Sequence, residues 1–143
     1  MWPFTSWTAS TRVNDAIAKK RSERSAAIQA GLRAAGNSDD SDPDSRYIQA
    51  DVAEIASNIR QRRWTAQRVM QAYVRAAARA HDRTNCLTEP LFVQALEEAR
   101  QLDTRLAQDP DNASDDHLLL GVPVSLKDQI NVKGIDSTIG FAR

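Results

Sequence analysis

Apolar positions recur at helical spacing in several stretches of this chain, and the first stretch is the least regular. Over residues 12 to 34 the apolar stripe consists of Val13, Ile17, Ile28 and Leu32. Basic residues interrupt this stripe, so the expected helix is only weakly amphipathic. Two interpretations stay open: an arm that packs across another domain or subunit, or a partly solvated helix with a charged face, which the interruption favours.

Two further helices are expected, joined by a short turn. Asp51 and Glu54 form a capping-box-like start for the first, which extends to about Arg62. Thr65 can cap the second helix. The apolar face of the second helix is made by Val69, Met70, Tyr73 and Ala77. This pattern predicts a helical hairpin, and such a face is more often part of a core than of a ligand pocket.

The helix that follows Pro90 has the most regular pattern. Thr88 is available as a cap, and proline is tolerated in a first helical turn. The apolar face runs over four turns and consists of Phe92, Ala95, Leu96, Ala99, Leu102 and Leu106. Cys86, in the short extended segment before this helix, is expected to be a small buried apolar residue without a catalytic role.

The last stretch of the chain has a different pattern. A short apolar run of strand type ends at Lys127. Because Val122, Val124 and Leu126 suit a buried strand, we expect the stem of this lysine to be drawn away from solvent. Burial disfavours the ammonium form and lowers the lysine pKa from about 10.4, so a neutral amine becomes available as a general base. Position alone is a weak signal, since lysines at strand ends are usually solvated.

The stretch from residue 36 to 45 separates the first helical pattern from the rest. It is acidic, poor in apolar residues and rich in turn formers, which is typical of a linker. Its spacing matches no EF-hand loop, and the two histidines are isolated from Cys86 and from each other, so no metal site is expected. The chain is therefore divided into an N-terminal helical arm (1–35), an acidic linker (36–45) and a remaining unit (46–143).

Composition narrows the classes of function and location. The 143 residues carry 19 basic and 19 acidic side chains, and this balance argues against a nucleic-acid partner. A single cysteine excludes an internal disulfide and favours a reducing compartment. Neither a signal peptide nor an apolar run of about 20 residues is present, so we expect a soluble, cytoplasmic protein without a membrane span.

The run GVPVSLKD, followed by VKG and DSTIG, resembles the amidase signature family, serine hydrolases of amide bonds with a Ser-Ser-Lys triad. Residues 46 to 143 carry the resemblance, and the segments NCLTE and PVSLKDQINVKG are most similar to its fungal acetamidase-like branch. One departure is Leu120, where family members often have a histidine. The resemblance implies an α/β fold: an α/β/α sandwich around a mixed sheet. This chain would supply its N-terminal, mainly helical part and the first lysine-bearing strand.

The resemblance also implies an activity, the hydrolysis of a small-molecule carboxylic acid amide to the acid and ammonia or an amine, without a cofactor. Lys127 matches the triad lysine of the family. Both serines of the triad lie well downstream of that lysine, so this chain supplies only the lysine. In the same loop, Asp128, Ser137, Thr138 and Gly140 would support the wall of the active site. A homodimer of the full-length enzyme is compatible with this picture. The alternative is a truncated, catalytically inactive helical binding or vestigial protein.

Overall fold

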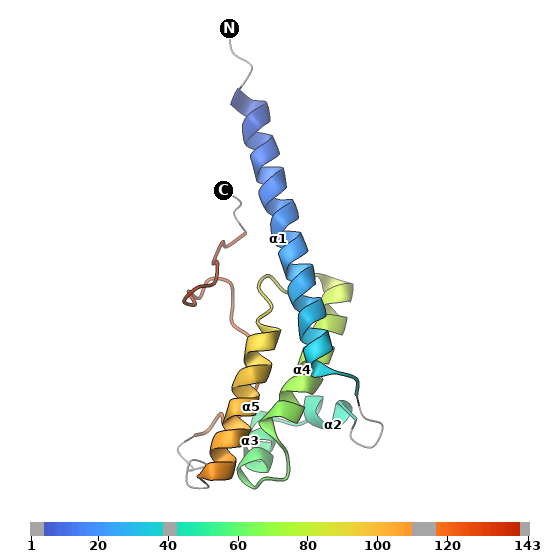
Figure 1. Cartoon of the computed structure of the whole chain (residues 1–143), viewed down its shortest axis with the longest axis vertical. Coiled ribbons are helices and arrows are strands. Elements are labelled where there is room, and N and C mark those ends of the chain that lie inside the picture. Colours follow the sequence, from blue (N-terminus) through green and yellow to red (C-terminus); the bar gives the residue numbers. More distant parts are fainter. Residues whose placement is uncertain (1–4, 39–42, 110–116, 141–143) are drawn as a thin grey trace.

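The computed structural model describes residues 5–38, 43–109 and 117–140, and within this part the regular elements are all helices (Figure 1). Helix α4 and helix α5 pack side by side, α1 packs against both, and the short α2 packs against α4. In Figure 1 the N-terminal half of α1 extends beyond the other helices. The helices are α1 (Thr5–Ala35), α2 (Ser45–Ile48), α3 (Val52–Arg60), α4 (Ala66–Thr84) and α5 (Phe92–Gln108).

The predicted starts of α3 and α4 are confirmed. The Asp51 carboxylate accepts a hydrogen bond of 2.7 Å from the backbone N–H of Glu54, and Thr65 Oγ1 accepts one of 3.2 Å from the N–H of Arg68. Both residues before the helices have extended backbone, as N-cap residues do. These side chains satisfy amide groups that have no partner inside the helix, so local sequence determines where both helices begin.

Besides Thr65, a carboxylate from α5 binds the start of α4. Asp103 accepts hydrogen bonds from the backbone N–H groups of Ala66, at 2.8 Å, and Gln67, at 2.9 Å. The N-terminus of a helix carries a partial positive charge, so an anion at this position is favourable. Asp103 therefore joins α4 to α5, the two helices that form the helical hairpin of this structure, and completes the cap that Thr65 begins.

The core lies between α3, α4 and α5. The apolar face predicted for α5 is confirmed at its centre, because Leu96, Ala99 and Leu106 are buried. The rings of Tyr47, in α2, and Trp64, just before α4, meet edge to face with centroids 5.0 Å apart. The main core cluster of buried residues contains Tyr47, Ile55, Ile59, Trp64, Ala66, Val69, Ala72, Ala99, Leu106 and Leu120.

Helix α1 is packed over its C-terminal half and largely exposed over residues 11–20. Ile28, Gly31 and Ala35 are buried against the hairpin of the same chain. A Cβ atom at Gly31 would lie 2.4 Å from Cβ of Phe92, so only glycine permits this close approach of α1 to α5. The interruption of the apolar stripe by basic residues thus coincides with the solvated part of the helix.

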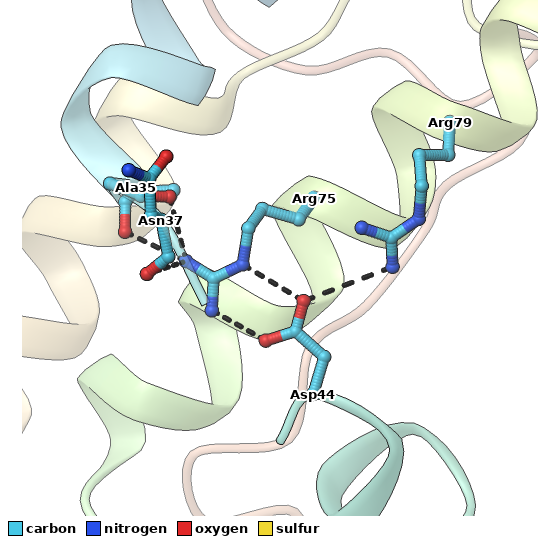
Figure 2. Close-up of polar contacts among 6 residues, drawn as sticks. Ala35, Asn37, Asp44, Arg75 and Arg79 are labelled. Carbon is cyan, nitrogen blue, oxygen red and sulfur yellow. Dashed lines mark hydrogen bonds and ion pairs between the residues drawn. The ribbon is translucent and has the colours of Figure 1, made fainter. Parts of the chain in front are cut away.

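Arg75 fixes the C-terminal end of α1 (Figure 2). Its guanidinium forms a two-pronged contact with Asp44, through bonds of 2.9 and 2.6 Å, and donates to the carbonyl oxygens of Ala35 and Gly36 at 2.8 and 3.0 Å. The last carbonyl groups of a helix have no partner within it, so a buried arginine is a suitable donor. Hydrogen bonding by Arg75 holds the pKa of Asp44 below its ordinary value of 3.8.

Asp44 belongs to the stretch predicted to be a linker, in which residues 39–42 lie outside the described residues. The carboxylate is buried, and its partner Arg75 lies on the third turn of α4. The division of the chain into arm, linker and remaining unit stays a prediction. What the structure adds is a specific contact between the end of that stretch and the helical hairpin.

Three local expectations were wrong. Residues 122–126 form no strand, and the described residues contain none at all, so the chain shows the helical portion of the expected α/β fold without its sheet. Helix α5 begins at Phe92 after Leu91 rather than at a Thr88 cap. Cys86 is exposed, not buried. A strand requires neighbouring strands for its backbone hydrogen bonds, and no described segment lies in that position.

Candidate functional site

The segment that contains Lys127 starts from a fixed point on the helical core. Leu120, at the position where the resemblance leads one to expect a histidine, is buried in the main core cluster. Gly121 follows with a φ of +68°, and a Cβ at this position would lie 2.5 Å from Cδ1 of Ile59. Glycine is favoured by the positive φ and by the lack of room for a Cβ atom beside Ile59. The helical bundle therefore determines where the segment leaves its surface.

Lys127 itself is exposed, in a stretch without regular secondary structure. Neighbouring apolar side chains are exposed as well, with 67% of Val124 and 56% of Leu126 accessible. None of the described residues forms a hydrogen bond or an ion pair with the Lys127 ammonium. The expectation of a lysine stem drawn in by a buried strand is therefore wrong for this chain, because no sheet covers these residues.

The residues after Lys127 fold back on themselves around Asp128. The Ser137 hydroxyl donates to the backbone carbonyl oxygen of Asp128, and the Asp128 carboxylate accepts a bond of 2.8 Å from the N–H of Ile139. Gly134 and Gly140 both have a φ of +81°, a backbone conformation that favours glycine. Two of the four residues that the resemblance assigns to the active-site wall are thus in contact.

A charged cluster attaches this loop to α1. Lys20 Nζ lies 2.6 Å from Asp136 Oδ2 and 3.0 Å from Glu89 Oε1. The hydrogen bond to Asp136, and to a lesser extent the one to Glu89, raises the pKa of Lys20 above its ordinary value. The same contact with Lys20 lowers the pKa of Asp136. Sequence analysis missed this cluster, because Lys20 and Glu89 are 69 positions apart and each has a side chain typical of a solvated surface.

An open groove lies beside this cluster, between α1 and the end of the described chain. Its walls are Ala16, Ile17, Lys20, Arg21, Arg24, Asn85, Asp136, Ser137, Thr138, Ile139 and Gly140. Thr138 and Gly140, the other two residues assigned to the active-site wall, line the groove together with Ser137. The structure thus gathers this part of the motif against α1, whereas Lys127 does not line the groove.

The remaining candidates for chemistry are isolated. His81 Nδ1 accepts a bond of 3.1 Å from the backbone N–H of Leu87, so the imidazole supports the loop after α4. No group of His, Cys, Asp and Glu side chains that could hold a metal ion was found among the described residues. None of the helices in the described part of the chain is long and apolar enough to cross a membrane.

The sequence of this chain is similar to a protein family and to several known proteins. A family model described as Amidase matches residues 68–143, which include Lys127. Amidase 1 of Gibberella moniliformis is 42% identical over 137 residues, which cover 95% of this chain and 24% of that protein. Amidase 2 of the same organism is 42% identical over 91 residues, which cover 64% of this chain and 17% of that protein.

Acetamidase of Emericella nidulans is 33% identical over 101 residues, which cover 71% of this chain and 18% of that protein. The chain thus spans about a quarter or less of the length of these curated relatives. No solved structure matches the chain.

Proposed function

Because the chain belongs to the amidase signature family, we propose that it is the N-terminal part of an amidase that hydrolyses carboxylic acid amides to the acid and ammonia or an amine. The observation that carries this proposal is the match of the family over residues 68–143, which contain the Lys127 motif. Similarity to the acetamidase of Emericella nidulans supports small aliphatic amides as substrates. A cytoplasmic location and a homodimer are parts of the same proposal.

In this proposal Lys127 is the general base of a Ser-Ser-Lys triad. The neutral amine takes a proton, through a bridging serine, from the nucleophilic serine that attacks the amide carbonyl carbon. Collapse of the tetrahedral intermediate expels the amine, which receives a proton through the same relay, and leaves an acyl-enzyme. Water then attacks the ester and releases the acid. Neither serine is assigned to a residue of this chain.

The exposure of Lys127 sets a physical condition for this role. A solvated lysine has a pKa of about 10.4 and is almost entirely protonated at neutral pH. It can act as a base only where desolvation or a neighbouring cation lowers that pKa. The exposed apolar side chains beside it, including Leu126 and Ile130, offer a surface that further protein could cover. We therefore propose that the rest of an amidase domain packs here and desolvates the amine.

The test replaces Lys127 with alanine in the longest product that the gene encodes. We expect hydrolysis of acetamide, measured as ammonia release, to fall by at least about 1,000-fold, as losses of triad members do. The Lys133→Ala variant is the matched control, since Lys133 is a second exposed lysine of the same loop and is expected to leave activity unchanged. Equal activity of the Lys127→Ala and wild-type proteins would remove Lys127 from the mechanism.

One observation favours a second candidate function, a catalytically inactive helical binding protein. Large apolar side chains are exposed around the segment, among them Leu118 at 76% and Leu119 at 59%. Surfaces of this kind mark interaction sites when they are contiguous. If the 143-residue chain alone is monomeric and unfolds cooperatively, this second function gains support. Aggregation of the isolated chain would instead support the enzyme.

A further inference from the structure

We propose that Lys20 of α1 is a positioning residue that holds the segment carrying Lys127 in place. This inference rests on the proposed amidase function, since it gives Lys20 a role only if Lys127 is the base. One ammonium group joins three parts of the chain: α1, the loop between α4 and α5 through Glu89, and the final segment through Asp136. The contact distances are 3.0 and 2.6 Å, which are those of hydrogen-bonded ion pairs.

The position of Asp136 is passed on to Lys127 through the loop that both residues share. Ser137 follows Asp136 directly, and its hydroxyl donates to the backbone carbonyl oxygen of Asp128. Asp128 in turn follows Lys127, whose own carbonyl oxygen accepts a bond of 2.8 Å from the N–H of Ile130. The loop is therefore closed by hydrogen bonds from Ser137 and Ile139 to Asp128, and Asp136, directly before Ser137, attaches this closed loop to α1.

The surroundings of Lys20 explain why this lysine, and not its neighbour, makes the attachment. Arg24, one turn further along α1, donates to the carbonyl oxygen of Leu87 at 3.4 Å and so holds the same loop that presents Glu89. Glu23 is the other acidic group near Lys20, at 3.8 Å. Lys19 forms its ion pair with Glu23, also at 3.8 Å, with 76% of its side chain exposed, and acts on Asp136 through its charge without a hydrogen bond or ion pair to it. Lys19 is thus a lysine of the same helix without the contact to the loop.

The Lys20 contact is accessible to solvent, and this property decides what it can do. The Lys20 and Asp136 side chains are 46% and 61% exposed. Exposed ion pairs contribute little to global stability and are screened by salt. An attachment of this kind changes the mobility and placement of one loop without unfolding the bundle. A displacement of about 1 Å at a reacting group can nevertheless lower a rate by up to about 100-fold.

The first measurement is amide hydrogen exchange of residues 128–139 in the longest product of the gene, compared for the wild type, Lys20→Ala, Lys20→Arg and Lys19→Ala. We expect exchange in this loop to be about two- to fivefold faster in Lys20→Ala, a factor that matches an exposed ion pair. Lys20→Arg and Lys19→Ala should exchange like the wild type. High salt should accelerate exchange in the wild type and leave Lys20→Ala unchanged. Equal exchange in all four proteins overturns the proposal.

The second measurement is amide hydrolysis by the same four proteins. We expect Lys20→Ala to lower kcat by about threefold or more, within the range for a misplaced catalytic group, with a smaller change in KM. Faster exchange with an unchanged kcat overturns the positioning role, because the loop would then move without consequence for the chemistry. If Lys127→Ala is as active as the wild type, the proposed base itself fails, and that result is distinct from either outcome for Lys20.

Discussion

Replacing Arg75 with methionine is expected to cost about 3–5 kcal/mol in the free energy of unfolding, the range for removal of one partner of a buried ion pair. The Asp44 side chain is only 11% exposed, and after the substitution the cation in contact with it would be Arg79, at 3.8 Å. The carbonyl oxygens of Ala35 and Gly36 would lose the same donor. Methionine retains much of the buried volume, so the cost reflects the lost polar contacts more than a cavity.

The assay is urea denaturation followed by far-UV circular dichroism, with Arg79→Met as the matched control. Arg79 lies one turn from Arg75 and contacts the same carboxylate, but 60% of its side chain is exposed. Its removal should cost less than about 1 kcal/mol. If Arg75→Met is too unstable to fold, Arg75→Lys keeps the charge without the planar fork and should lose an intermediate amount. Equal losses for the methionine variants of Arg75 and Arg79 would refute the reasoning.

Two further predictions concern pH and packing. Arg75 lowers the pKa of folded Asp44 below 3.8, so this contribution to stability is present above 3.8 and is lost as the pH falls through the folded pKa. The stability difference between wild type and Arg75→Met should therefore shrink in urea titrations below pH 3.8, and a constant difference would contradict the assignment. Gly31→Ala should cost about 1–3 kcal/mol through overpacking against Phe92, although alanine favours helices, whereas Ser25→Ala on the exposed face of α1 should be neutral or stabilising in the same titrations.

The parts of the fold that sequence predicted well are those encoded within a few residues. The caps at Asp51 and Thr65 involve groups three positions apart, and both were confirmed. The apolar face of α5 repeats with helical periodicity, so the burial of Leu96 and Ala99 followed from the pattern. The predicted start of α5 was wrong, because Thr88 and Pro90 offer a local start signal but the helix begins only at Phe92.

The contacts that sequence did not predict join residues far apart. Arg75 and Asp44 are 31 positions apart, and both are residue types that are normally solvated. The burial of Asp44 also depends on α2, a single short helix at the end of an acidic stretch with few apolar residues. No periodicity in the sequence marks either residue. The packing of α1 against α4 brings the carbonyl groups at the C-terminal end of α1, which have no partner within the helix, to the Arg75 guanidinium.

For the site, sequence identified the motif and not its surroundings. The assignment of Lys127 came from similarity of the motif, and its catalytic role stays a prediction. The strand that should have buried it was wrong for this chain, since β structure depends on partners elsewhere, whereas a helix satisfies its own backbone. The family comparison supports the motif over residues 68–143, while α1, which supplies Lys20, lies outside that match.

The cap that Asp103 provides has a consequence for synthesis of the chain. The backbone N–H of Gln67 is hydrogen-bonded by Asp103, which lies 36 residues further along the chain. At 5–20 residues per second, the ribosome adds Asp103 about 2–7 s after Gln67. During that interval the start of α4 has the Thr65 cap but not the Asp103 cap. The hairpin becomes complete when α5 emerges and returns to the start of α4, so translation itself orders the assembly of these two helices.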